Sequence, residues 1–357
     1  MKKYAILMLL LLALLVTLLP ACTPKPEEPA APSALEKVHW NIALWGKTRD
    51  LTLPIEIFAQ DMFQLTDGLW ELEIHYGGVL AAPKESLEGI ENGLYQASMI
   101  VSSHYPSKLS LFSATELPFL APQTVEQICR WEQAIGNHPA VVAQMAERNA
   151  KFIFPAVLPQ FNFTSKEPIR KVEDFDGLRI RATKLQASVF EPFGAVALMP
   201  DITEVYTAVE RGMLDAPLTG WSYNPGAWGW YTLTPYATIG IDAGTIGVGF
   251  VANKQAWDAL PEEWIKLAEW WAENKATGEY VKAYALGDAK WIPKYIESGM
   301  KIETFSPEER AKLLPHARPA WEDWVKRNEG LGLTSARDVL DFAESKTAEL
   351  MAAAEQK

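Results

Sequence analysis

From His39 onward, short apolar segments alternate with longer amphipathic ones, and this alternation constrains the fold class. Within residues 69–76, large apolar side chains take every second position, as in a strand with one buried face. Residues 54–67 instead repeat their apolar side chains at helical spacing, and Gly68 follows as a stop signal. Helix-length spacers between strands favour βαβ units whose strands pair in parallel. The sequence therefore predicts an α/β fold.

The rest of the chain repeats both patterns. Further strands are expected at residues 39–46, 96–101, 151–157, 178–182, 247–252 and 300–305. Further helices are expected at residues 84–94, 123–149, 203–211 and 262–286, with two more near the carboxyl end. The glycines at 244–249 are interpreted as a tight turn into a strand, because the strand and helix that flank a phosphate-binding loop are missing. About 320 residues follow the amino-terminal segments, which is enough for two lobes.

The amino-terminal segment predicts export. Two lysines precede an uncharged apolar run at residues 5–19, which is too short for a comfortable membrane span. The run ends at Pro20-Ala21-Cys22, which resembles a bacterial lipobox. We therefore expect a lipoprotein signal peptide at residues 1–21 and a lipid on Cys22. The alternatives are an ordinary signal peptide or a single uncleaved anchor, with Cys22 incidental.

Residues 22–36 are expected to form a tether. They are rich in proline and have no aromatic residues or periodicity, so they cannot bury enough apolar surface to fold. Such a chain runs extended at roughly 3.1 Å per residue and holds a folded body about 40 Å from a membrane. A lipid anchor with a spacer predicts a protein that works beside a membrane, on its periplasmic or cell-surface side.

Charge and cysteine content narrow the possible partners. The formal net charge is −12, and removal of residues 1–21 with their two lysines moves it to about −14. An acidic body argues against nucleic acid and against an anionic membrane surface as partners. If Cys22 carries a lipid, Cys129 has no disulfide partner. Cys129 falls in an apparent amphipathic helix, and we expect it to be buried rather than nucleophilic.

The sequence contains no recognisable catalytic motif. Its five histidines show no metal-binding spacing. A nucleophile elbow, a P-loop and a dinucleotide fingerprint are all missing. Carboxylates are plentiful, but the sequence gives no means of pairing two of them for acid–base chemistry. We therefore expect a binding protein rather than an enzyme and no cofactor, while a metal that bridges ligand and protein is left open.

A series of short motifs runs in order from about residue 40 to residue 330. The motifs are Gly89–Gly93, Glu116–Leu120, Gly177–Arg181, Gly194-Ala195, Glu204-Val205-Tyr206, Arg211-Gly212 with Asp215, Val251–Lys254, Trp257 and Leu260-Pro261. Each fragment alone is weak, but their order and spacing together are specific. The series resembles the DctP-type solute receptors of tripartite ATP-independent periplasmic (TRAP) transporters.

The resemblance implies a two-lobed, periplasmic-binding-protein-like α/β fold, with crossing strands between the lobes and a long helix that spans both. Lobe I would contain residues 37–160 and about 246–290, and lobe II residues 161–245 and 291–330. A C-terminal helix at 331–357 would pack on this body. Members of the family capture small organic acids and deliver them to a membrane permease. The alternatives are a receptor for an ABC importer, a chemosensor, a periplasmic enzyme or a structural envelope lipoprotein.

The resemblance also implies that Arg181 pairs with the ligand carboxylate. A guanidinium stays charged and offers a fork of donors that matches two carboxylate oxygens. Arg179 points to the same face of a regular strand and is the competing candidate. The structural alternative for Arg181 is a salt bridge to a neighbouring carboxylate.

The remaining site predictions concern ligand size and the lining of the cleft. Some family members have a second basic residue before the Asp-x-x-Gly turn, where this chain has Glu167 beside Lys166. We therefore expect a monocarboxylate. Side chains expected to line the cleft are Trp45, Tyr105, Phe161, Leu218, Thr219 and Trp221. The aromatic ones either pack against the apolar part of the ligand or serve as ordinary core or hinge residues.

Overall fold

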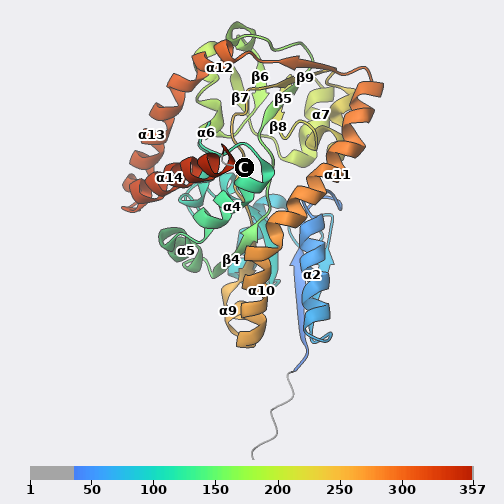
Figure 1. Ribbon diagram of the computed structural model, residues 1–357, viewed down its shortest axis with the longest axis vertical. Coiled ribbons are helices and arrows are strands. Elements are labelled where there is room, and N and C mark those ends of the chain that lie inside the picture. The colour runs from blue at the N-terminus through green and yellow to red at the C-terminus, as the bar shows by residue number, and fades with distance from the viewer. Residues whose placement is uncertain (1–35, 356–357) are drawn as a thin grey trace, which may run out of the picture. The chain divides into compact units, whose positions relative to one another are not determined.

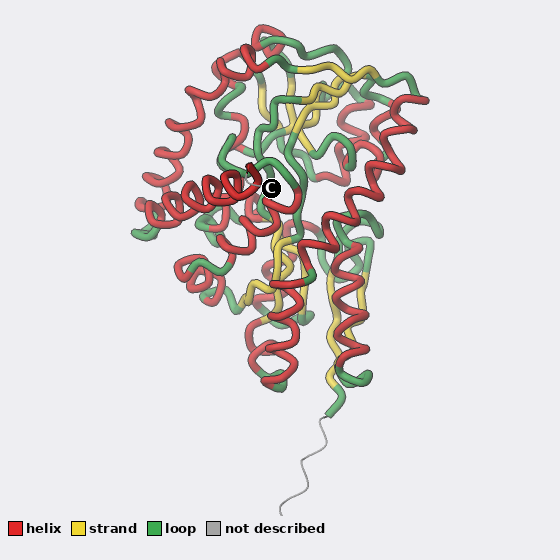
Figure 2. The backbone as a smooth tube through the Cα atoms, viewed as in Figure 1, coloured by secondary structure: helices red, strands yellow, loops and turns green. Residues whose placement is uncertain are grey.

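Two β-sheets carry the fold of residues 36–355, the part of the chain that the computed structural model describes (Figures 1 and 2). The first sheet has five strands in the order β2-β1-β3-β10-β4, and the second has six in the order β11-β9-β5-β8-β6-β7. The strands are β1 Val38–Ala43, β2 Trp70–His75, β3 Ala97–Val101, β4 Ala150–Pro155, β5 Asn162–Ser165, β6 Arg179–Arg181, β7 Val196–Leu198, β8 Ala216–Thr219, β9 Tyr236–Ile239, β10 Val248–Asn253 and β11 Lys301–Thr304. All of them belong to one structural unit, residues 37–357. The predicted signal peptide, Cys22 and nearly all of the tether lie outside the described residues.

Helices cover both sheets. They are α2 Leu53–Leu65, α3 Ser86–Glu91, α4 Val125–Gly136, α5 Pro139–Ala146, α6 Lys184–Ala187, α7 Val205–Glu210, α8 Asn224–Trp228, α9 Lys254–Asp258, α10 Glu262–Asn274, α11 Ala276–Glu297, α12 Pro307–Leu313, α13 Ala317–Gly330 and α14 Ala336–Glu355. Among the helices that the structure describes, none is both long and apolar enough to cross a lipid bilayer.

The direction of the strands shows how the chain passes between the sheets. β1 pairs in parallel with β2 and β3, as the βαβ prediction requires. β10 runs antiparallel to β3 and β4, so the parallel expectation is wrong there. The reason is that β10 follows β9 of the second sheet without an intervening helix that would reverse the chain. β5 follows β4 in the same way and is antiparallel to both of its neighbours. These two connections are the predicted crossings between two lobes.

An aromatic cluster fixes α2 against the first sheet. Phe58 of α2 packs edge-to-face on Trp70, Phe154 and Trp271, with ring centroids 6.2, 5.2 and 5.1 Å away. All four side chains are completely buried. Because large aromatic side chains remove the most apolar surface from water, this cluster contributes much of the burial in this half of the core.

The long helical segment predicted at residues 262–286 is two helices. α10 ends before Lys275, and α11 then continues well beyond the predicted end. Near its start, Thr277 of α11 donates a hydrogen bond to the thiol of Cys129 in α4, at 3.4 Å. Near its end, the Tyr295 hydroxyl accepts one from the backbone N–H of Gly226 in α8, at 2.7 Å. α11 therefore packs against elements of both sheets, as the predicted spanning helix should (Figure 1).

The helix predicted at residues 123–149 is also two helices, because α4 ends at Gly136 and α5 begins at Pro139. A proline has no N–H to donate and disfavours helical geometry in the residue before it. His138 accordingly has extended backbone angles. A single helix was therefore the wrong prediction, and Pro139 was the signal for the break.

The last helix, α14, packs against α4 and α13. The indole N–H of Trp131 in α4 donates to the Ala343 carbonyl at 3.0 Å. The Thr347 hydroxyl donates to the Leu120 carbonyl at 2.8 Å. These contacts place the carboxyl-terminal helix against α4, which in turn packs on β4 of the first sheet. The lobe boundaries given above stay predictions.

Candidate ligand-binding site

A cavity with an empty volume of about 550 Å³, including its open part, takes side chains from both sheets and from the connections between them. The first sheet and its loops contribute Trp45, Arg49, Leu51, Pro83, Val101, His104 and Val248. The second sheet and its loops contribute Arg181, Met199, Ile202, Tyr223, Asn224 and Trp228, and the crossings contribute Leu158, Phe161 and Ile246. Ligand sites in α/β proteins form where strand ends meet, and this cavity has that position.

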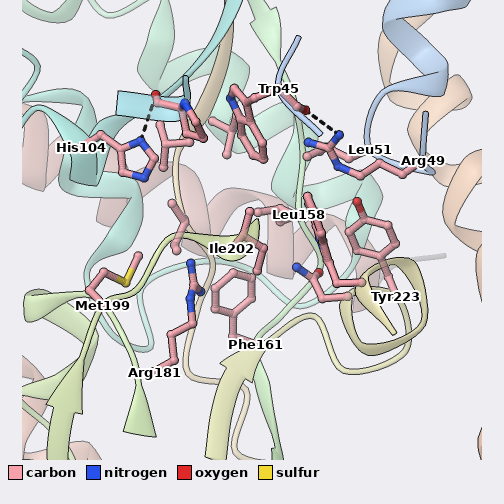
Figure 3. Close-up of a pocket in the computed structure, with 16 residues that line it drawn as sticks. Trp45, Arg49, Leu51, His104, Leu158, Phe161, Arg181, Met199, Ile202 and Tyr223 are labelled. Atoms are coloured by element: carbon pink, nitrogen blue, oxygen red, sulfur yellow. Dashed lines mark hydrogen bonds between the residues drawn. The ribbon is translucent and has the colours of Figure 1, made fainter. Parts of the chain in front are cut away.

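Arg181 ends β6 and reaches into the cavity (Figure 3). The residue is 5% exposed, and its Nε donates to the Pro200 carbonyl oxygen at 3.2 Å. Within residues 36–355, Nη1 and Nη2 have no hydrogen-bond partner, and no carboxylate lies within 4.0 Å of them. The structural alternative for Arg181, a salt bridge to a neighbouring carboxylate, is therefore not formed within the described residues.

Burial lowers the pKa of Arg181 to about 10, and the charge of Asp201 opposes this shift. The guanidinium therefore stays protonated at neutral pH. Asp201 itself forms an ion pair with Lys84 at 3.2 Å. Arg181 thus presents both of its Nη groups to the cavity without a protein acceptor for either, and a charge on a buried residue is costly unless a ligand pairs with it.

Arg179, the competing candidate, is already paired. Its Nε and Nη2 donate to the two carboxylate oxygens of Asp215 at 2.7 and 2.6 Å, and Nη1 donates to the Gly212 carbonyl. Burial tends to raise the pKa of Asp215, but the hydrogen bonds and charge of Arg179 outweigh it, and the pKa is lowered. Arg179 does not line the cavity. The two arginines of this strand therefore have separate roles.

Trp45 and Phe161, two of the six expected cleft residues, line the cavity. Trp45 lies in the loop after β1, and Phe161 lies in the crossing that leads to β5. Both are almost fully buried. Trp45 follows β1, whose two neighbours are parallel to it, and the carboxyl ends of parallel strands lie at one edge of the sheet. Phe161 instead reaches the cavity from a connection between antiparallel strands.

The other four expected cleft residues do not line the cavity. The Tyr105 hydroxyl accepts a hydrogen bond from the Leu87 N–H at 2.9 Å. Leu218 and Thr219 are buried within β8. Trp221 packs against a tyrosine of α11, with ring centroids 6.5 Å apart. Contact of these four with a ligand stays a prediction.

Among the polar and aromatic residues that line the cavity, sequence reasoning missed five. They are Arg49, His104, Tyr223, Asn224 and Trp228. Arg49 and His104 had a usable signal, since each follows a predicted strand at the edge where ligands bind.

The guanidinium of Arg49 is held in place by its neighbours. It lies over the rings of Trp45 and Trp228, 4.6 and 5.4 Å from their centroids. Its Nη1 donates to the carbonyl oxygens of Trp45 and Lys47 at 3.0 and 2.8 Å. Stacking and hydrogen bonding together fix the plane of the group.

The charges that line the cavity are positive. Its lining contains two arginines and no aspartate or glutamate. His104 contributes no charge at neutral pH, because burial lowers its pKa, and its Nδ1 donates to the Pro83 carbonyl at 3.2 Å. The cavity therefore favours a ligand with negative charge.

Reactive groups are not gathered at this site. Among residues 36–355, no cluster of three histidine, cysteine, aspartate or glutamate residues is arranged to hold a metal. Cys129 is buried as predicted, and burial raises the pKa of its thiol to about 12. A thiol that stays protonated is a poor nucleophile.

The fold and the cationic cavity define a two-lobed solute receptor of the periplasmic-binding-protein type. The chain belongs to the DctP family, bacterial extracellular solute-binding protein family 7, whose model matches residues 45–328. Proteins of this family are extracytoplasmic receptors for transport, not enzymes.

Individual relatives and solved structures are similar to this chain at low sequence identity. A monocarboxylate 2-oxoacid-binding periplasmic protein from Nostoc sp., all3028, is 24% identical over 86% of this chain and 85% of its own. The C4-dicarboxylate-binding protein DctP of Rhodobacter capsulatus is 26% identical over 72% of this chain and 75% of its own. A TRAP solute-binding protein from Rhodoferax ferrireducens, crystallised with benzoate, superposes with TM-score 0.78 and 16% identity over 89% of this chain and 100% of its own. A TRAP solute-binding protein from Sulfitobacter sp. with bound β-D-galacturonate superposes with TM-score 0.73 and 16% identity, over 86% of this chain and 100% of its own.

Proposed function

We propose that this TRAP solute-binding receptor captures a small monocarboxylate in the cavity and delivers it to a membrane permease. The observation that carries the proposal is the Arg181 guanidinium, which is buried, charged and open at both Nη atoms. A carboxylate accepts from both Nη atoms at once and neutralises the charge.

The class of solute is argued from the rest of the lining. Apolar side chains such as Leu158, Phe161, Met199 and Ile202 surround the arginine and suit the body of an organic acid. The name of the Nostoc relative supports a monocarboxylate, and that of the R. capsulatus relative supports a dicarboxylate. We favour the monocarboxylate because Arg181 alone presents two open Nη groups.

The expectation that no cofactor takes part stays a prediction.

Closure of the two lobes around the solute is part of this proposal. Lys84, between β2 and α3, forms its ion pair with Asp201, which follows β7 of the second sheet. The pair therefore joins the two sides of the cavity near Arg181. Closure would exclude water and strengthen the charged contact.

The first prediction tests Arg181. Arg181→Ala should weaken binding of the acid about 100-fold or more, because it removes the only partner of a buried carboxylate. A thermal-shift screen of mono-, di- and aromatic carboxylates would identify the acid, and calorimetry would measure its affinity. Small-angle scattering of the same samples should show the wild-type radius of gyration falling on binding.

Arg179→Ala is the matched control, because Arg179 lies on the same strand but is paired with Asp215. The affinity of Arg179→Ala for the acid should stay within about threefold of the wild-type affinity, because the loss of an exposed ion pair changes a free energy only slightly. An Arg181→Ala protein that is folded and binds within twofold of the wild type would contradict the proposal.

We also propose a lipid anchor at Cys22 and a site of action on the periplasmic or cell-surface side. The support is the basic start, the apolar run and the lipobox-like sequence, together with the extracytoplasmic location of the family.

A further inference from the structure

His104 lines the cavity opposite Arg181. The residue is half-buried and ends a short 3-10 turn, Ser102–His104, that follows β3 of the first sheet. Arg181 reaches the cavity from β6 of the second sheet. Figure 3 shows the two side chains on opposite sides of the cavity. An organic anion bound at Arg181 would therefore face a histidine ring from the other wall.

The neutral ring of His104 has a defined tautomer. Its Nδ1 lies 3.2 Å from the Pro83 carbonyl oxygen, and a carbonyl oxygen only accepts, so the proton is on Nδ1. Nε2 then carries a lone pair. No group among residues 36–355 forms a hydrogen bond with Nε2, and Figure 3 shows this nitrogen directed away from the Nδ1 hydrogen bond and toward the side of Arg181. The neutral ring thus presents an acceptor to an anion, which also accepts.

The charges around His104 determine what a bound anion changes. Burial lowers the pKa of His104, the Pro83 carbonyl and the charge of Asp201 oppose this shift, and the charges of Lys84 and Arg181 add to it. Asp201 and Lys84 are paired with each other at 3.2 Å. Arg181 is therefore the neighbouring charge that a solute can neutralise. A carboxylate at Arg181 removes that repulsion and adds a negative charge beside the ring, and both effects favour protonated histidine.

We infer that His104 couples solute binding to proton uptake. When the organic anion binds at Arg181, Nε2 of His104 takes up a proton from water and donates to the anion. The inference rests on the proposed function, because the carboxylate at Arg181 supplies the negative charge. The receptor then binds its solute more tightly in mildly acidic surroundings and more weakly as the pH rises.

The direction of the effect follows from the proton count. The complex holds more protons at His104 than the free receptor does, so the affinity rises as the pH falls and levels off once the ring is protonated in both states. Between pH 8 and pH 5, the affinity should rise about tenfold or more, after correction for protonation of the acid itself. This is the effect expected of an opposite charge within about 4–6 Å of the ring.

Calorimetry in two buffers of different ionisation enthalpy would count the protons. The probe is the carboxylic acid that gives the largest thermal shift in the screen described above. Wild-type protein should take up about half a proton or more per acid bound where the affinity changes most steeply with pH. His104→Asn keeps an amide that can donate to the Pro83 carbonyl but cannot titrate, and its proton uptake and pH dependence should disappear. His316→Gln is the matched control, because His316 lies outside the cavity lining, and it should behave as the wild type does.

Glu116 is the competing proton acceptor near this wall. Burial raises its pKa to about 7, and its carboxylate accepts a hydrogen bond from Ser102, two residues before His104. Proton uptake that persists in His104→Asn and disappears in Glu116→Gln would assign the proton to Glu116 and overturn the inference.

A measurement on the wild type tests the same point without a variant. In an NMR titration, the acid should raise the pKa of the His104 ring, and a pKa that is unchanged or lowered would overturn the inference. If the acid binds and Arg181→Ala abolishes binding, but no proton is taken up, the inference fails and the proposed function stands. If no acid binds the wild type, both fail.

Discussion

At the scale of single residues, the surroundings of a charged group decide its role. Arg179 and Arg181 stand two positions apart on β6, and their sequence context is nearly the same. Asp215 pairs with the first, whereas no carboxylate within the described chain is in reach of the second. The free guanidinium is therefore the one available to a ligand.

Glu132 is a second residue whose surroundings matter. It is completely buried in α4, and neither carboxylate oxygen has a hydrogen-bond partner among the described residues. Burial raises its pKa well above the usual 4.5, and the charge of Glu116 adds to the shift. Glu116 is buried too, and burial raises its pKa to about 7. Glu132 therefore favours the protonated form in the folded protein, whereas Glu116 titrates near neutral pH.

Replacement of Glu132 should change the pH dependence of stability. A folded-state pKa above the unfolded one means that the native state holds more protons, so the contribution of Glu132 to stability is greatest below about pH 4.5 and is lost as pH rises. The fall is about 1.4 kcal/mol per pH unit for each such group while it titrates. Glu132→Gln removes one titrating group, and the free energy of unfolding should then decline less between pH 5 and pH 8.

Urea unfolding at several pH values would measure this difference. Glu126→Gln is the control, since Glu126 lies in the same helix but is exposed and paired with Arg130. A Glu132→Gln protein whose stability falls as steeply as that of the wild type would show that Glu132 is charged when buried.

At the scale of elements, the contact between α8 and α11 depends on a glycine. A Cβ at Gly226 would lie 2.2 Å from the Trp291 ring, well inside van der Waals contact. Tyr295 of α11 accepts the Gly226 N–H as well. At this contact α11 reaches the part of the molecule that contains the second sheet. Any displacement here therefore affects the packing of both α8 and α11.

Gly226→Ala should therefore destabilise the protein by about 1–3 kcal/mol, the cost of overpacking a buried contact. Gly278→Ala in α11 is the matched control, because nothing lies within 4 Å of its added Cβ. That change should stabilise α11 by up to about 1 kcal/mol, since alanine is the better helix former. Urea unfolding of both variants would measure the two effects, and equal stabilities would refute the steric argument.

At the scale of the whole molecule, the path of the chain creates the binding site. Both connections between the sheets contribute lining residues, Leu158 and Phe161 from one and Ile246 from the other. A movement of one lobe against the other changes the cavity directly, because these hinge segments are also part of its wall.

The anchor at Cys22 is a prediction for the full chain. When the protein is expressed with its leader in a bacterium, labelled fatty acid should be incorporated and the protein should fractionate with membranes. Cys22→Ser should abolish the label, since the acceptor thiol is lost. Cys129→Ser, at the buried cysteine, should keep it. Label that persists in Cys22→Ser would exclude this site of lipidation.

Much of the fold was predictable from local patterns. The alternation in residues 69–76 correctly predicted β2, and the helical spacing in 54–67 correctly predicted α2. Periodicity reports which side of an element is buried, and that is a local property of the chain. It does not report strand direction, which is why the antiparallel pairing of β10 was missed.

The sequence by itself determined the α/β class, the ordered family motifs, the export signal as a prediction, and Arg181 as the candidate anchor. Only the tertiary structure decided that Arg179 is paired, that Tyr105 and Trp221 lie off the cavity wall, and that Arg49 shares the cavity with Arg181. The physical reason is distance along the chain. Arg49 and Arg181 are far apart in sequence, so their common cavity follows from how the two sheets pack and not from any local pattern.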